Sequence, residues 1–204
     1  MTGITEKTAA SVELRAARIP GIVGIIADHY WFVIDKGGEE KVKQRWEVWQ
    51  NKDAGGQSWH YLHKNLKDWQ SGVGNGPSRL EYCWYGLEAQ SLIEAIETSP
   101  SQYPYVPCYR YWPGPNSNTY VQWVLDQARI TEIPGPSAIG KDYLGLIGSK
   151  VSRQGLLFST PVVGAAFSRG KYVIFQLMTL PFGWSMKPFR LLYPGLRLQQ
   201  NKNR

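Results

Sequence analysis

A hydroxyl group at an expected helix start is the most chemically informative feature of this sequence. The segment from Trp112 to Tyr120 reads W-P-G-P-N-S-N-T-Y, and an amphipathic run follows it. A helix start carries unpaired backbone N–H groups and the positive end of the helix dipole. The small polar residues here can therefore form a helix cap, an anion site, or a site in which Ser117 is a nucleophile. A cap explains one polar residue but not three in succession.

A serine nucleophile needs a base within hydrogen-bond reach, because the pKa of its own hydroxyl is far above neutral. The chain has three histidines, and His29 lies in an apolar, aromatic segment typical of a strand. His29 is therefore either the general base or a core histidine. Glu47, on the expected return strand, is the candidate that would orient His29, and its alternative role is a solvated strand charge.

The polar and aromatic residues around this hydroxyl are the candidates for contacting a substrate. They are Asn116, Asn118, Thr119, Trp112, Lys141 and Asp142. Lys141 can meet an anionic substrate and Asp142 can complete the site, whereas a structural salt bridge or turn explains the same pair.

A metal site is not expected. His60 and His63 have the loose spacing of a metal motif with Asp68 near them, but no third ligand anchors the motif. We therefore predict no metal and no cofactor.

The elements that must position these residues are strands and two helices. Residues 25–35 and 41–49 flank a Gly-Gly turn and predict a β-hairpin, and residues 79–85 predict a further strand. Helical spacing predicts helices over 88–98, where Pro100 follows, and over 118–128.

These elements predict a single α+β domain over residues 1–204, with an antiparallel sheet and two principal helices. Residues 1–18 are expected to be a polar lead-in, and the segment from Glu13 to Arg18 allows a turn of helix or a strand. Residues 155–198 are apolar and broken by glycine and proline, which predicts a β-rich C-terminal part.

Composition and charge limit the kinds of partner that we expect this protein to bind. The formal charge is +7 with a pI of about 9.4, but the basic residues are scattered, which disfavours nucleic-acid binding. Two cysteines make no disulfide framework, and neither an apolar leader nor a membrane span is visible, so we expect a cytoplasmic protein. The apolar C-terminal part, with basic residues around it, allows peripheral membrane contact.

The order of these residues resembles the circularly permuted papain-like hydrolases of NlpC type, which include the lecithin:retinol acyltransferase branch. The shared features are a strand histidine, a polar residue on a neighbouring strand, and an Asn-flanked nucleophile at a helix start. The resemblance implies that fold, with His29 as base, Ser117 as nucleophile and Glu47 as orienting residue. Serine stands where those hydrolases have cysteine, so the resemblance implies a serine variant of the site or one that has lost catalysis.

A closer resemblance is to an uncharacterised bacterial family, a domain of unknown function. It rests on the motifs at residues 103–105, 112–120 and 138–145, and on His29-Tyr30-Trp31. The resemblance covers roughly residues 20–150 and implies no activity.

Two functions follow from these observations. One is a Ser/His-dependent hydrolase or acyltransferase acting on an amide or ester. The alternative is a non-catalytic module on the same fold that binds a small molecule, glycan, peptide or lipid head group through the polar box and a Trp-rich surface.

Overall fold

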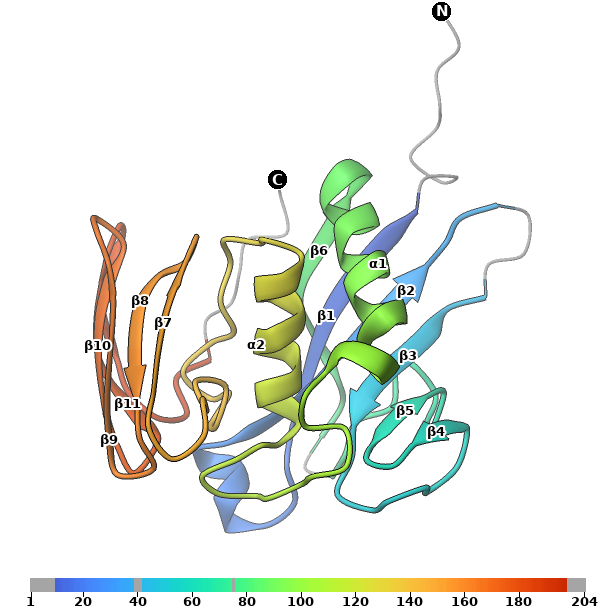
Figure 1. Ribbon diagram of the computed structural model, residues 1–204, viewed down its shortest axis with the longest axis horizontal. Helices are drawn as coiled ribbons and strands as arrows, with labels where there is room; N and C mark the ends of the chain where they lie inside the picture. Colours follow the sequence, from blue (N-terminus) through green and yellow to red (C-terminus); the bar gives the residue numbers. More distant parts are fainter. Residues whose placement is uncertain (1–9, 39–41, 75, 198–204) are drawn as a thin grey trace, which may run out of the picture.

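Two antiparallel six-stranded sheets and two α-helices make up the described part of the chain (Figure 1). The structure is a computed structural model that describes residues 10–38, 42–74 and 76–197. The predicted α+β class with an antiparallel sheet and two principal helices is confirmed. The permuted papain-like arrangement stays a prediction.

The first sheet has the strand order β4-β5-β3-β2-β1-β6. Its strands are β1 (Ser11–Arg18), β2 (Asp28–Asp35), β3 (Gln44–Val48), β4 (Gln57–Trp59), β5 (Leu62–Lys64) and β6 (Arg79–Tyr85). A 3₁₀ turn, η1 (Ile22–Ile25), leads into β2. The expected hairpin is therefore formed by β2 and β3, which pair antiparallel.

Strand β1 corrects the expected polar lead-in. It lies between β2 and β6, and Val12, Leu14 and Ala16 are fully buried. The charged residues Glu13 and Arg15 made this segment look solvated, but they alternate with the apolar ones. A strand directs alternate side chains to opposite faces, so Glu13 and Arg15 pair with each other at 2.7 Å on the face away from the main core. Residues 1–9 lie outside the described residues.

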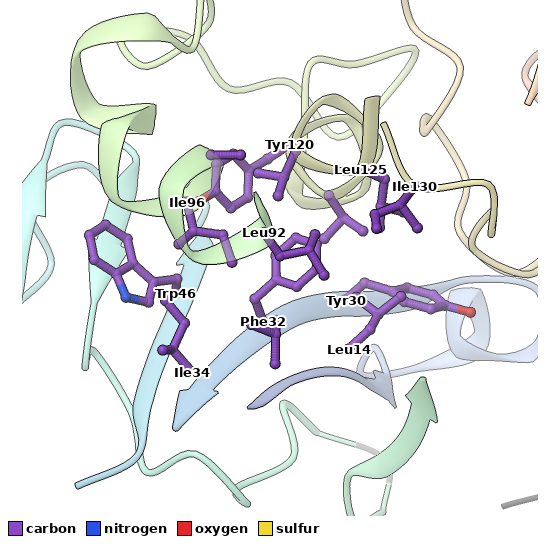
Figure 2. Close-up of a cluster of buried hydrophobic side chains, with 14 of the residues drawn as sticks. Leu14, Tyr30, Phe32, Ile34, Trp46, Leu92, Ile96, Tyr120, Leu125 and Ile130 are labelled. Carbon is purple, nitrogen blue, oxygen red and sulfur yellow. The ribbon is translucent and has the colours of Figure 1, made fainter. Parts of the chain in front are cut away.

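Helices α1 (Gly86–Gln102) and α2 (Ser117–Gln127) cover one face of this sheet. Figure 2 shows Phe32 and Ile34 of β2 facing Ile96 of α1, with Tyr120 of α2 packed above them. Burial of these large side chains is the main force that holds the two helices on the sheet.

Helix α1 runs beyond the predicted end and includes Pro100 in its last turn. Proline has no backbone N–H and cannot bond the carbonyl four residues earlier, that of Ile96. The Ser99 hydroxyl donates to that same carbonyl at 2.6 Å, which satisfies it and lets the helix continue.

The second sheet is a meander with the order β12-β11-β10-β9-β8-β7. Its strands are β7 (Gly148–Ser152), β8 (Gly155–Ser159), β9 (Val163–Ser168), β10 (Tyr172–Leu177), β11 (Leu180–Met186) and β12 (Phe189–Leu192). It lies beyond α2 and is seen nearly edge-on at the left of Figure 1. Gln154 joins the second sheet to the rest of the protein. Its side-chain oxygen accepts a hydrogen bond from Gln122 on α2, and its side-chain nitrogen donates to the carbonyls of Ile130 and Glu132.

Candidate active site at the start of strand β2

His29 and Glu47 are joined side chain to side chain. The Nε2 atom of His29 lies 2.7 Å from Glu47 Oε2, and both side chains are buried, with 6% and 0% exposed. The contact is possible because β2 and β3 are neighbours and the two residues share one face of the sheet. The structure therefore brings together the histidine and the carboxylate that the sequence singled out.

The protonation of this pair follows from its surroundings. Burial raises the pKa of Glu47, but the hydrogen bond to His29 and the charge of Arg45 outweigh it, so this pKa lies below 4.5. Burial is also the dominant influence on His29 and lowers the pKa of the ring below 6.5, despite the opposing effect of Glu47. At neutral pH an ionised Glu47 thus accepts from a neutral imidazole that carries its proton on Nε2.

The second ring nitrogen of His29, Nδ1, is not hydrogen-bonded to any residue that the structure describes. In the tautomer set by Glu47, Nδ1 carries the lone pair that accepts a proton in general-base catalysis. Trp31 stacks on the ring at a centroid distance of 5.6 Å, and Trp49 meets it edge-on at 5.2 Å. These contacts restrict the rotation of the imidazole.

Arg45 is the site residue that sequence reasoning missed. Its side chain is fully buried, with Nε 2.7 Å from Glu47 Oε1 and a terminal nitrogen 2.8 Å from Glu47 Oε2. Its other terminal nitrogen donates to the carbonyls of Asp68 and Ser71, and its guanidinium lies over the Trp31 ring. The signal was present in the sequence, because residues 45 and 47 alternate onto one face of a strand.

The polar box at the start of α2 is a complete capping box. The Asn116 side chain accepts from the backbone N–H groups of Asn118 and Thr119, and the Thr119 hydroxyl accepts from the Asn116 N–H. Two of the N–H groups expected to form an anion pocket are therefore already used within the helix cap.

The same side chains tie the helix start to its surroundings. The Asn116 and Asn118 amides both donate to the Ile139 carbonyl, and Asn118 also donates to the Asp28 carbonyl at 3.0 Å. The Thr119 hydroxyl donates to the Gly140 carbonyl at 2.7 Å. Asn116, Asn118 and Thr119 thus make structural contacts, which explains three successive small polar residues without a ligand.

Ser117 differs from its neighbours in the box. Its hydroxyl makes a single contact, with Asn118 Oδ1 at 3.4 Å, and its backbone N–H has no acceptor in the described part of the chain. Helical spacing puts Ser117 on the same side of α2 as Tyr120, Val121 and Val124, which pack on the sheet. Ser117 and His29 are not hydrogen-bonded to each other. Helix α2 packs on the sheet face of Tyr30 and Phe32, whereas strand alternation puts His29 with Trp31 and Glu47 on the other face, so the structure does not pair the predicted nucleophile with the predicted base.

The remaining predicted substrate-binding residues lie elsewhere. Lys141 and Asp142 form a buried salt bridge at 2.5 Å, and Gln176 of β10 donates to the same carboxylate oxygen. This pair links the loop after α2 to the second sheet. It borders a cavity of about 20 Å³, which holds about one water molecule. Trp112 is 47% exposed, and its indole N–H donates to the Met178 carbonyl.

Of the other two histidines, His63 lies directly across from Glu47 in the pairing of β3 with β5 but is not hydrogen-bonded to it. His63 is buried, with its ring bonded to the Ser58 hydroxyl and the Asn51 carbonyl. No group of three or more potential metal ligands occurs among the described residues.

Asp28 forms a second ionic cluster that the sequence did not reveal. Its buried carboxylate accepts from Arg79 at 2.6 Å and from Arg197 at 2.8 Å. Burial raises the pKa of Asp28, but the two arginines outweigh that effect and hold it below 3.8. Arg197 lies 169 positions away along the chain, so no local pattern could indicate this contact.

Fold and site together define an α+β protein with a buried His–Glu–Arg array on the face of the first sheet that the two helices leave uncovered. The chain belongs to a family described as proteins of unknown function, DUF3750, whose model matches residues 9–143. The match ends before the second sheet begins at Gly148. No curated protein and no solved structure matches the chain at the required significance. None of the described helices is long and apolar enough to cross a membrane.

Proposed function

We propose that this protein is an acyl-transfer enzyme, a hydrolase or acyltransferase acting on an ester or amide, with Ser117 as nucleophile and His29 as general base. One observation carries the proposal. Among the described residues the Ser117 N–H and His29 Nδ1 have no partner, the Ser117 hydroxyl is only weakly engaged, and the two residues lie next to the Asn118–Asp28 bond, on opposite faces of the sheet. All the other polar residues of the box are committed to structural bonds.

Each group has a defined role in the proposed reaction. The Ser117 hydroxyl oxygen attacks the carbonyl carbon, and its proton passes to His29 Nδ1. Glu47 holds the ring through Nε2 and stabilises the imidazolium that forms, while Arg45 keeps Glu47 ionised. The Ser117 N–H donates to the developing oxyanion. His29 then returns the proton to the leaving group, and water or a second acceptor removes the acyl group from Ser117.

Serine suits this arrangement chemically. An alcohol depends on an oriented, neutral base more than a thiol does, because the helix dipole alone cannot ionise it. Burial keeps His29 neutral and Glu47 orients it, which meets that requirement. This reasoning, with the order of the site residues, also supports the permuted papain-like arrangement that the sequence resembles.

The direct test is labelling with a fluorophosphonate probe, followed by mass-spectrometric location of the adduct. We expect wild-type protein to be labelled at Ser117, and Ser117→Ala to abolish labelling. His29→Gln should slow it by at least about a hundredfold, the usual contribution of a general base. Ser101→Ala is the matched control, since this serine is exposed on α1. Unlabelled wild-type protein, or labelling that survives both site variants, would refute the proposal.

A binding module is the second candidate, because Tyr111 and Trp112 are neighbouring exposed aromatic residues beside the box, 66% and 47% exposed. Such side chains stack on the faces of sugars and peptides. Calorimetric titration with cell-wall fragments tests this function. Trp112→Ala should abolish the heat of binding and Ser117→Ala should leave it unchanged, whereas the absence of binding by wild-type protein would eliminate this candidate.

A further inference from the structure

The two faces of the second sheet depart from the usual division into an apolar inner face and a polar outer face. One face packs toward the rest of the protein, and its small apolar core is Leu157, Ala166, Ile174 and Leu192. The same face also buries polar residues, among them Ser159, Ser168 and Gln176. A sheet with one face in water normally turns its apolar side chains inward and its polar ones outward.

The opposite face is apolar over all six strands and is here called the outer face. Cross-strand pairing places its residues in two main rows. The first row is Val151, Leu156, Phe167, Val173, Trp184 and Leu191, and the second is Ser149, Phe158, Ala165, Phe175 and Phe182. Neither row contains a charged side chain.

The outer face is solvent-accessible in the isolated chain. Val151 is 79% exposed, Leu191 66% and Phe175 55%. In Figure 1 the sheet is the outermost layer, and no other described segment covers it. A contiguous apolar patch of this kind on a water-soluble surface marks a contact with another apolar phase.

The distribution of charged residues indicates which apolar phase the outer face contacts. From residue 143 to the end of the sequence there is no aspartate or glutamate, although lysine and arginine recur throughout. Arg153, Arg169, Lys171 and Lys187 lie in the turns β7–β8, β9–β10 and β11–β12. Alternate turns of an antiparallel meander lie at the same end, so these positive charges gather along one edge of the outer face.

We propose that the outer face docks on a bilayer that contains anionic lipid. The aromatic and aliphatic rows enter the boundary between head groups and acyl chains, and the basic turns contact anionic head groups. A second copy of the chain fits less well, because it would bring the same positive turns and no acidic residue of the sheet to pair with them. The proposal does not depend on the chemistry at Ser117.

Vesicle co-sedimentation of the full chain tests this proposal. Wild-type protein should pellet with vesicles of phosphatidylcholine and phosphatidylglycerol but not with phosphatidylcholine alone, and added salt should release it. Phe175→Thr/Trp184→Thr removes two outer-face anchors and should weaken binding at least about tenfold. Arg169→Gln/Lys171→Gln should weaken it about fivefold for each charge.

Two controls make the result decisive. Leu87→Gln changes a residue of α1 that is 81% exposed, and it should bind like wild type. Light scattering of wild-type protein and the Phe175→Thr/Trp184→Thr variant reports oligomeric state, and circular dichroism reports folding. Failure of wild type to bind anionic vesicles, or equal binding by a folded outer-face variant, would overturn the proposal. A wild-type dimer that this variant dissociates, without vesicle binding, would assign the outer face to a second copy.

Discussion

The side-chain amide of Asn118 donates to the backbone carbonyl of Asp28 at 3.0 Å and so ties the first turn of α2 to the start of β2. Ser117 precedes one partner of this bond and His29 follows the other. The bond therefore fixes the start of α2 against the start of β2, with the Ser117 hydroxyl and the His29 imidazole on opposite faces of the sheet.

Ser117→Ala and Asn116→Ala should differ in their effects on stability. Asn116→Ala removes the helix cap and two further bonds to carbonyls, and should lower the free energy of unfolding by about 2 kcal/mol. Ser117→Ala removes a single 3.4 Å contact and should change it by less than about 0.5 kcal/mol. Urea denaturation measures both. A comparable loss in the Ser117 variant would make that hydroxyl structural.

A thiol placed at Ser117 should be unusually acidic. We predict that Ser117→Cys, in a Cys83→Ser/Cys108→Ser background, shows a thiol pKa at least about 1 below the ordinary value of about 8.5. The unpaired N–H groups and the dipole of the helix start favour the thiolate. The pH dependence of alkylation by iodoacetamide gives this pKa.

The matched variant for this measurement is Ser101→Cys in the same background, which should titrate normally. An ordinary pKa in Ser117→Cys would show that the helix start does not act on this position.

Removing the charge of Glu47 should strongly destabilise the fold. Glu47→Gln leaves the fully buried guanidinium of Arg45 without its ionic partner, while the amide can still accept from His29. Loss of one partner of a buried pair costs about 3 kcal/mol or more. Chemical denaturation of Glu47→Gln and of the exposed control Glu88→Gln makes the comparison, and equal stabilities would contradict the expected role of the ion pair.

Stability should fall with acidity in a window set by His29. Its pKa is lower in the folded protein than the unfolded value of 6.5, so the unfolded chain takes up the proton first. The stability that neutral His29 contributes to the folded protein is fully present above pH 6.5, and it is lost as the pH falls through the pKa of His29 in the folded protein. Glu47 adds a similar loss only below its ordinary value of 4.5.

Thermal unfolding from about pH 8 to about pH 5 measures this dependence. Wild type should lose stability below 6.5, whereas His29→Gln should show a flatter profile, because glutamine does not titrate. Parallel profiles for the two proteins would mean that His29 has the same pKa folded and unfolded.

Local patterns in the sequence account for much of this site. Alternation and the Gly-Gly turn indicated the hairpin that pairs His29 with Glu47, and Pro-Gly-Pro before small polar residues indicated the start of α2. For residues 13–18 the sequence left a turn of helix and a strand open, because Glu13 and Arg15 interrupt the apolar pattern, and the burial of β1 was not predicted. Pro100 was placed outside α1 because the Ser99 hydroxyl, which replaces the missing donor, acts only once the helix is formed.

The sequence by itself determined which side chains share a face, because the period of a strand or helix is a local property of the backbone. It thereby determined that His29 and Trp31 lie together, and that the apolar residues of β8 to β11 lie together. Only the tertiary structure decided which face is covered. Asn118 and Arg197 both bond Asp28, and each of these contacts joins segments that are distant in the sequence. The second sheet docks on α2 through Gln154, which leaves the aromatic face of that sheet outermost. Such contacts depend on how preformed elements pack, which no local period encodes.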